Sequence, residues 1–286
     1  MIRRRPFLTG ALALPLAACR ARAGSQPALV EVPDTLRVMT LNLAHGRGRA
    51  LTQSQLRTVS YFETNLDTIA RVLQREKPAV VALQEAELGS RWAGGFDHVR
   101  YLSERSGLPH LHATPHMNEP PRFRYGTALL SRYPLDRPAG GTFSVGGRWN
   151  KGWTEASVQT SVGRVRVVSV HLDFASERRR AQQVEELTAA LRQVDEPLVV
   201  MGDMNSTWSD ADRSAVILLA TALDLRTWST DRSEAPTFGR RRIDWIMVTP
   251  PIELAQRQVL TGDRLSDHRG VVVDLFVSGR NPLLEV

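Results

Sequence analysis

Cysteine is almost absent from this sequence, since Cys19 is the single one among 286 residues. No disulfide can therefore form within the chain, and a zinc site built on thiolates is excluded. Long hydrophobic runs are missing too, because no apolar stretch reaches the ~18 residues that a membrane-spanning helix needs. The hydrophobic content of 42% is still sufficient for one large soluble domain or two small ones.

Three common catalytic patterns are also missing. The chain has no Gly-x-Ser-x-Gly nucleophile elbow, no Walker phosphate-binding loop and no His-Glu-x-x-His helix. Its chemistry is therefore not described by any of these three templates.

The first residues differ from the rest of the chain. Residues 3–5 are all arginine and precede a short apolar run, Pro6 to Ala18, which ends directly before Cys19. A basic head followed by a short apolar core is typical of an export signal. A disordered basic start followed by a buried helix is the alternative interpretation.

Two export patterns overlap in this segment. Residues 4–8, Arg-Arg-Pro-Phe-Leu, resemble a twin-arginine signal, and residues 16–19, Leu-Ala-Ala-Cys, resemble the bacterial lipobox that is cleaved before its cysteine. We therefore expect residues 1–18 to be an export signal and residues 19–35 to be a tether lipidated at Cys19. The protein would be exported to the cell envelope or periplasm and anchored to a membrane by its lipid.

Removal of the export signal lowers the net charge from +7 to +4, because 34 basic and 30 acidic residues stay in the chain. This small excess suits an anionic substrate or membrane surface, but it does not demonstrate nucleic-acid binding.

Hydrophobic periodicity predicts a domain with both helices and strands. Strands are expected at 36–43, 79–83, 127–130, 156–161, 165–171, 198–201, 243–248 and 271–277, and helices at 55–77, 177–194 and 211–223. Because hairpins occur beside helices, a purely parallel sheet is excluded and two packed sheets with helices outside are favoured. We expect the domain to span residues 36–278, followed by a C-terminal tail at 279–286.

Polar residues lie at or beside the ends of the expected strands. The apolar run at 197–201 leads into Gly202-Asp203-Met204-Asn205, where the glycine lets the backbone turn and aim a carboxylate and an amide into one pocket. An Asx-rich loop that only closes a strand would give the same pattern. The other motifs of this kind are Thr40-Leu41-Asn42, Leu83-Gln84-Glu85, Val170-His171-Leu172-Asp173, Arg242-Ile243-Asp244 and Ser266-Asp267-His268.

In this order and at this spacing, the six motifs resemble those of the endonuclease/exonuclease/phosphatase superfamily, the DNase-I-like metal-dependent phosphoesterases, over residues 36–276. The resemblance implies an α+β fold, a four-layer α/β/β/α sandwich of two mixed sheets with helices outside and the active site at one end. It also implies Mg²⁺ or Mn²⁺, held by Asn42, Glu85 and Asp267. Such ions prefer carboxylate, carbonyl and water oxygens.

The resemblance also gives roles to the remaining polar residues. His268 would be the general base or the imidazole that faces the phosphate, with Asp244 orienting its other nitrogen. His171 would contact phosphoryl oxygens. Asp203 would position or deprotonate the attacking water, and Asn205 would donate a hydrogen bond to the phosphate.

Two branches of the superfamily differ from this chain at His171. DNase I pairs the matching histidine with a glutamate from a neighbouring strand, and residues 122–125 offer no clear counterpart. Abasic-site endonucleases carry a tyrosine where this chain has His171, which disfavours that branch.

Two further segments could reach the substrate. Residues 178–180 are arginines on an expected helix and form either a solvated face or, with Gln183, a contact to the phosphate. Lys151 lies between Trp149 and Trp153 in a glycine-rich loop. These tryptophans could stack on a base or sugar, lie against lipid head groups or pack on the core.

The resulting expectation is a monomeric Mg²⁺-dependent phosphoesterase that hydrolyses a phosphodiester or phosphomonoester with an activated water. An exported DNA or RNA nuclease of the same fold is one alternative, and a noncatalytic lipid-anchored binding module is another. The polar residues expected for the reaction are all present, which disfavours the noncatalytic module. The substrate stays open among DNA, RNA, a lipid head group and a soluble ester, although the small net charge favours a compact phosphoester.

Overall fold

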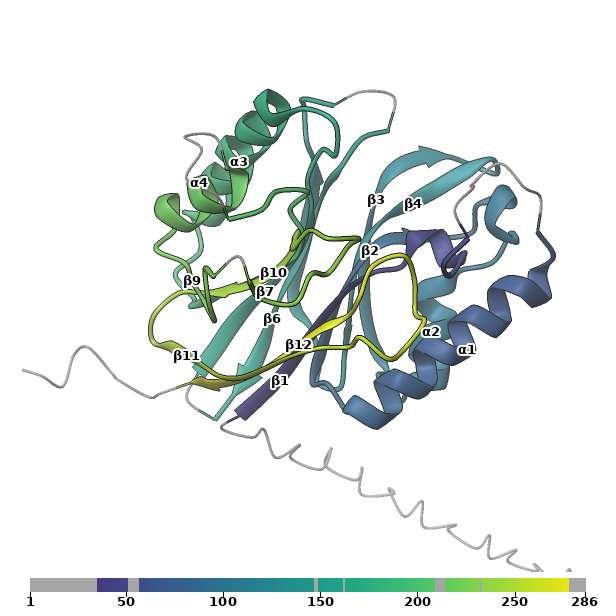
Figure 1. The fold of residues 1–286 in the computed structure, drawn as a ribbon, viewed down its shortest axis with the longest axis horizontal. Helices are drawn as coiled ribbons and strands as arrows, with labels where there is room; N and C mark the ends of the chain where they lie inside the picture. The colour runs from purple at the N-terminus through teal and green to yellow at the C-terminus, as the bar shows by residue number, and fades with distance from the viewer. Residues whose placement is uncertain are drawn as a thin grey trace, which may run out of the picture. The chain divides into compact units, whose positions relative to one another are not determined.

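Two six-stranded sheets face each other in this computed structural model, which describes residues 35–50, 57–146, 149–161, 163–208, 214–231 and 233–277 (Figure 1). The first sheet has the order β11 (Ile252–Val259), β12 (Val271–Val277), β1 (Thr35–Asn42), β2 (Val80–Glu87), β4 (Phe123–Ser131) and β3 (His110–Glu119). The second has the order β5 (Asp136–Thr142), β6 (Gly152–Thr160), β7 (Gly163–His171), β8 (Leu198–Asp203), β10 (Asp244–Val248) and β9 (Arg226–Thr227).

Each sheet contains one parallel pair, joined by a crossover helix as parallel neighbours require. The helix α1 (Val59–Glu76) joins β1 to β2, and α3 (Glu177–Leu191) joins β7 to β8. Both strands of a parallel pair end at the same edge of the sheet. Asn42 is therefore in register with Gln84, and His171 is in register with Asp203.

Helices cover the outer face of each sheet (Figure 1). α1 and α2 (His98–Ser106) pack on the first sheet, while α3 and α4 (Ala215–Ala222) pack on the second. Between the sheets, buried side chains such as Val38 and Val80 share one core with Val167 and Val199. This arrangement confirms the predicted α+β fold, a four-layer sandwich of two mixed sheets with helices outside.

The start of α1 differs from the prediction. The apolar periodicity placed a helix from residue 55, yet residues 57 and 58 are not helical. Thr58 is the N-cap, since its side-chain oxygen accepts a hydrogen bond from the backbone N–H of Tyr61. A hydroxyl in this place satisfies one of the free N–H groups of the first turn, so the helix begins at Val59.

Several elements escaped the sequence prediction for a common reason. β3, β5, β9 and β11 are the outermost strands of the two sheets, and β5 and β11 bury few side chains. Without a buried face, a strand lacks the alternating hydrophobic pattern that marks it in a sequence. β7 begins at Gly163, two residues before the strand that was expected from residue 165.

The expected export signal, Cys19 and the C-terminal tail lie outside the described residues. None of the helices in the described ranges is long and apolar enough to cross a membrane.

Candidate active site

A cleft of about 610 Å³ lies at the edge where both parallel pairs end. It is lined by all but one of the residues that the sequence singled out for chemistry: Asn42, Glu85, His171, Asp203, Asn205, Asp267 and His268. The exception, Asp244, lies directly behind His268 and is buried. Residues from six separate motifs thus meet in one place.

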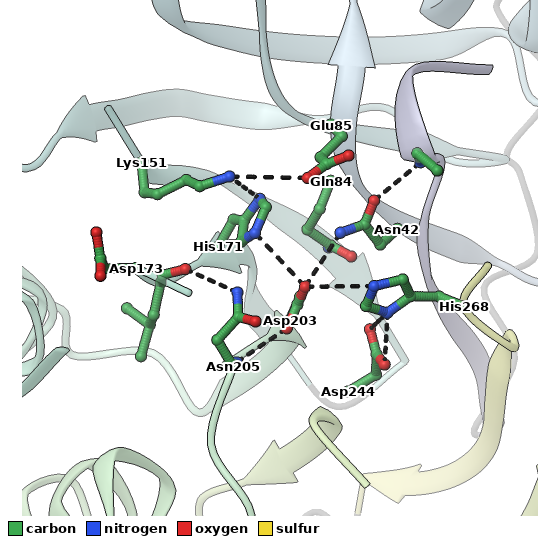
Figure 2. Close-up of polar contacts among 12 residues, drawn as sticks. Asn42, Gln84, Glu85, Lys151, His171, Asp173, Asp203, Asn205, Asp244 and His268 are labelled. Carbon is green, nitrogen blue, oxygen red and sulfur yellow. Dashed lines mark hydrogen bonds and ion pairs between the residues drawn. The ribbon is translucent and has the colours of Figure 1, made fainter. Parts of the chain in front are cut away.

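Asp203 lies at the centre of the polar network (Figure 2). Its Oδ2 accepts a hydrogen bond from Asn42 Nδ2 at 3.1 Å and lies 3.5 Å from His171 Nε2 and 3.8 Å from His268 Nε2. Its Oδ1 accepts a hydrogen bond from the backbone N–H of Asn205 at 2.9 Å. One buried carboxylate therefore links polar groups from both sheets.

The backbone before Asp203 depends on glycine. Gly202 has a φ of +148°, and a Cβ added there would lie 1.9 Å from the carbonyl oxygen of Val170 on the neighbouring strand. Only a residue without a side chain allows this close approach of β8 to β7.

Glu85 is presented by a distortion of β2. The strand pairing shifts between Leu83 and Ala86, which marks a bulge, and Glu85 itself has a φ of +48°. Non-glycine residues rarely adopt this left-handed conformation, and bulges often re-aim a side chain beside an active site. The bulge turns the Glu85 carboxylate into the cleft, away from its ordinary place along the strand.

His268 is oriented by Asp244, as the sequence resemblance implied. Its Nδ1 donates to the two carboxylate oxygens of Asp244, at 2.9 and 3.1 Å, so its Nε2 faces Asp203. Burial lowers the pKa of His268, but the Asp244 and Asp203 carboxylates outweigh burial and raise it to about 10. Burial and the Asp244 carboxylate raise the pKa of Asp203 to about 7. Near neutral pH, His268 therefore keeps its proton, while the neighbouring Asp203 carboxyl can gain or lose one.

Lys151 fixes the tautomer of His171. The ammonium Nζ can only donate, and it lies 3.3 Å from His171 Nδ1, which must accept; Nε2 therefore carries the hydrogen and points at Asp203. Burial and the Lys151 charge hold the pKa of His171 well below its ordinary value, so the ring is neutral. The neighbour sought for His171 at residues 122–125 is thus a lysine directly before β6 rather than a glutamate.

His45 was missed by the sequence prediction, although it follows Asn42 by only three residues. It lies in the short 3₁₀ turn η1 (Ala44–Gly46) with a φ of +55°. Its Nδ1 is 2.6 Å from Glu87 Oε1, and its Nε2 is 3.3 Å from Glu85 Oε2. The ring of His45 therefore bridges the two glutamates, one in the cleft and one fully buried beneath it.

Electrostatics keep Glu85 ionised. Burial alone would raise the pKa of its carboxyl, but the nearby charges of His45 and Lys151 outweigh burial and lower it. Lys151 Nζ lies 3.8 Å from Glu85 Oε1. In contrast, burial raises the pKa of the neighbouring Glu87.

Two groups of donors in the cleft suit a divalent metal ion. Ligand atoms of Asp203, Asp244 and His268 all lie within 4.8 Å of one another. However, Asp244 already directs both of its oxygens at His268 Nδ1. This first group is therefore organised for proton transfer at least as much as for metal binding.

The second group is Asn42, Glu85 and Asp267. Asp267 Oδ2 accepts a hydrogen bond from Arg47 Nη2 at 2.8 Å, while its buried Oδ1 has no partner among the described residues. A buried carboxylate oxygen without a partner is costly, and a bound cation would satisfy it. An ionised glutamate, an aspartate and an amide oxygen fit an oxygen-preferring ion such as Mg²⁺.

Of the two expectations for the arginine-rich face of α3, the contact of Gln183 with the phosphate is not supported, since Gln183 does not line the cleft. Gln183 instead accepts from the backbone N–H of Asp173 at 2.7 Å and donates to the carbonyl of Val145 at 3.0 Å. Arg180 donates to the Asp173 carbonyl, and neither residue lines the cleft. These side chains hold the loop after β7 in place.

The tryptophan loop divides into two parts. Trp153 packs partly buried against the α3 and α4 core, with its ring centroid 5.3 Å from that of Phe143. Trp149, which is 44% exposed, lines the cleft. The core-packing interpretation is thus right for Trp153, whereas Trp149 presents exposed surface at the cleft.

The sequence profile described as "Endonuclease/Exonuclease/phosphatase family" matches residues 39–268, a span that includes every clustered residue above. This chain belongs to the endonuclease/exonuclease/phosphatase family. The family hydrolyses phosphoesters and includes phosphodiesterases, phosphatases and nucleases that depend on divalent metal ions. The buried Asp203, Asp244 and His268 cluster is consistent with that dependence.

Solved structures of the family share the fold. An endonuclease/exonuclease/phosphatase from Beutenbergia cavernae DSM 12333 is 23% identical, with a TM-score of 0.65 over 85% of this chain and 72% of that chain. Sphingomyelinase C from Streptomyces griseocarneus (18% identity, TM-score 0.59) and a mannosyl-6-phosphatase from Bacteroides thetaiotaomicron VPI-5482 (15%, 0.61) each match 84% of this chain and 99% of their own. No curated protein matches this sequence.

Proposed function

We propose that this protein is an exported, monomeric, Mg²⁺-dependent hydrolase of phosphodiesters or phosphomonoesters. The observation that carries the proposal is the contact of one buried carboxylate, Asp203, with Asn42, His171 and the Asp244-oriented His268 (Figure 2). A noncatalytic binding module has no need for this set of proton donors and acceptors. Uncatalysed hydrolysis of a phosphoester is among the slowest reactions known, and these groups can activate water and hydrogen-bond the phosphate.

The metal ion would be held by Glu85, Asp267 and Asn42. When bound, it offsets the negative charge of the phosphoryl oxygens as a Lewis acid. The ionised state of Glu85 and the unpartnered Oδ1 of Asp267 support this assignment. Mn²⁺ is the expected substitute for Mg²⁺ because both prefer oxygen ligands.

Asp203 is the residue we assign to the attacking water. With a pKa raised to about 7, its carboxylate can take a proton from water near neutral pH. His268 then faces the phosphate, and Asp244 holds its imidazole in one orientation.

His171 and Asn205 supply hydrogen-bond donors. His171 Nε2 carries a hydrogen on the cleft side because Lys151 occupies Nδ1. Asn205 Nδ2 donates one hydrogen to the carbonyl of Leu172, which fixes the amide and leaves its second hydrogen for a phosphoryl oxygen.

The test is a substrate panel measured in Mg²⁺ and again in excess EDTA. It includes bis(p-nitrophenyl) phosphate, p-nitrophenyl phosphate, sphingomyelin vesicles and duplex DNA. We expect turnover of at least one ester in Mg²⁺ or Mn²⁺ and its loss in EDTA. Undiminished turnover in excess chelator would refute metal-dependent hydrolysis.

Export and anchoring are proposed from the sequence alone. Cys19→Ser should release the protein into the soluble periplasmic fraction, and Arg4→Lys together with Arg5→Lys should block export of the folded precursor. Lipoproteins carry more than one acyl chain, so the unaltered protein should sediment with membranes. A Cys19→Ser protein that still sediments with membranes would contradict the lipobox interpretation.

A further inference from the structure

Aromatic side chains surround the polar centre of the cleft. We call Trp92, Phe123, Trp149, Phe174 and Phe238 the aromatic rim. Three of its members, Trp149, Phe174 and Phe238, are among the few large hydrophobic side chains in the described ranges that are exposed, with Phe174 at 64%. Exposed apolar surface gathered in one concave place marks a binding site for apolar matter.

The rim starts directly at the reacting groups. The ring of Phe238 lies over that of His268, with their centroids 4.6 Å apart and an interplanar angle of 36°. Near Glu85, the rings of His45 and Trp92 form a T-shaped contact with their centroids 4.7 Å apart. Phe123 continues this wall outward, with its centroid 6.2 Å from Trp92 and 5.5 Å from Trp149. If a phosphate is bound at the polar centre, the first atoms of a group bonded to it would therefore already contact the aromatic rim.

Among the described residues, the basic side chains that line the cleft lie at its centre. Lys151 lies between His171 and Glu85, and Arg47 is paired with Asp267. The third cation that lines the cleft, Arg241, donates to the carbonyl of Asn205 at 3.4 Å. All three cations thus contact residues of the site itself. A strand of nucleic acid needs cations at successive phosphates. Beside the aromatic rim, the described contacts place one arginine, Arg122, whose guanidinium lies 5.2 Å from the centroid of the Phe123 ring.

On the basis of the proposed function, we infer that the substrate is a phosphoester with one phosphate and a large apolar alkyl group bonded beside it. The polar centre holds the phosphate. The aromatic rim removes the apolar group from water, which favours binding in proportion to the apolar area that is buried. A membrane lipid and a soluble amphiphilic ester share this chemistry.

The experiment compares two diesters that differ only in their apolar part, methyl p-nitrophenyl phosphate and hexyl p-nitrophenyl phosphate. We expect kcat/KM to be at least about tenfold higher for the hexyl ester, since each buried methylene contributes and the rim can cover several. Phe174→Ser and Trp149→Ser should each lower this hexyl-to-methyl ratio to within about threefold, mainly through KM. Trp228→Ser is the matched control, because Trp228 is 43% exposed but does not line the cleft, and it should keep the full ratio.

The outcomes separate this inference from the proposed function. Equal kcat/KM for the two esters, or an unchanged ratio in both rim variants, overturns the inference while metal-dependent hydrolysis stands. If neither ester is hydrolysed, the proposed function fails, and the rim is still tested by calorimetric binding of hexylphosphonate against methylphosphonate. Tighter binding of hexylphosphonate that is lost in Phe174→Ser supports the inference; equal binding overturns it.

Two further arms identify the source of the apolar group. Hydrolysis of sphingomyelin or phosphatidylcholine in vesicles supports a membrane lipid, and hydrolysis of the hexyl ester without vesicle turnover supports a soluble amphiphile. Thymidine 5′-(p-nitrophenyl phosphate) represents a nucleotide. Its clear preference over the hexyl ester, together with efficient cleavage of duplex DNA, would overturn the inference in favour of a nuclease.

Discussion

Two carboxylates of one cleft, Glu85 and Asp203, come from corresponding strands of the two sheets and meet opposite surroundings. Glu85 belongs to a bulge in β2, where His45 and Lys151 lower the pKa of its carboxyl. Asp203 ends the regular strand β8, where burial and the Asp244 carboxylate raise its pKa to about 7. Although both residues lie on strands of parallel pairs, Glu85 stays anionic and Asp203 can exchange a proton. This separation of pKa values is how neighbouring acids take different roles in a single site.

The largest effect on activity is expected from removing the residues that exchange protons, Asp203 and His268. Asp203→Ala and His268→Ala should each lower kcat by roughly 10²- to 10⁴-fold, the range typical of general acid–base groups. The loss should persist at saturating Mg²⁺, because neither residue belongs to the proposed ligand set. Circular dichroism checks that both variants are folded; full turnover by either folded variant would contradict the assigned roles.

A variant of Glu85, the carboxylate that stays anionic, should depend differently on the Mg²⁺ concentration. Glu85→Gln removes the charge but keeps the shape, so its activity should be low at limiting Mg²⁺ and recover at least partly as Mg²⁺ is raised. Asp203→Asn should show no such recovery. Glu253→Gln, at an exposed position on β11, serves as control. A Glu85→Gln variant with an unaltered Mg²⁺ requirement would remove the distinction between the two carboxylates.

A smaller effect is expected beneath Glu85. His45→Phe keeps a ring between Trp92 and Tyr125 but removes both nitrogens, so Glu85 loses the contact that holds it. Partners of metal ligands typically contribute 10- to 100-fold in affinity, so we expect the Mn²⁺ dissociation constant from calorimetry to rise by about that factor. Glu87→Gln keeps a hydrogen-bonding group for His45 and should lose less.

The control for this measurement is His112→Gln, at a half-buried histidine that does not line the cleft. Mn²⁺ affinity should be unaltered there. Equal affinity in folded His45→Phe would show that the His45 contact does not support the metal site.

The smallest effect concerns salt. Because the described cations that line the cleft lie at its centre, turnover of a compact ester should change by less than about threefold between roughly 50 and 200 mM salt. A steep fall in turnover over this range would indicate that the substrate contacts the protein through several phosphates. The cationic surface used in binding would then reach beyond the centre of the cleft.

The sequence was most informative where structure is local. A polar residue directly after a buried run, as at Asn42, Asp203 and His171, is visible in the chain, and parallel pairing then brings such residues together. The four-layer fold follows from the same runs. The edge strands β5 and β11 gave no comparable signal because their side chains are mostly exposed.

The contacts that tune the site depend on tertiary structure and could not be predicted. Lys151 reaches His171 only because the first residues of β6 pair with the last of β7. Glu87 looks like an ordinary exposed acid in the sequence, yet it is completely buried under His45. Trp149 and Trp153 have similar sequence surroundings, but only Trp153 faces the α3 core and is partly buried, while Trp149 is exposed.

The hydrogen bond from Asn42 to Asp203 joins residues 161 positions apart, and Ser266 Oγ donates to the Asn42 carbonyl from 224 positions away. The reacting groups therefore come from the first strand of the domain, its middle and its last loop. No fragment released early from the ribosome contains a complete site, and hydrolysis can begin only after the final strands have been synthesised and packed. A nascent or prematurely terminated chain that ends before residue 266 should accordingly be harmless to phosphoesters in the compartment where it is made.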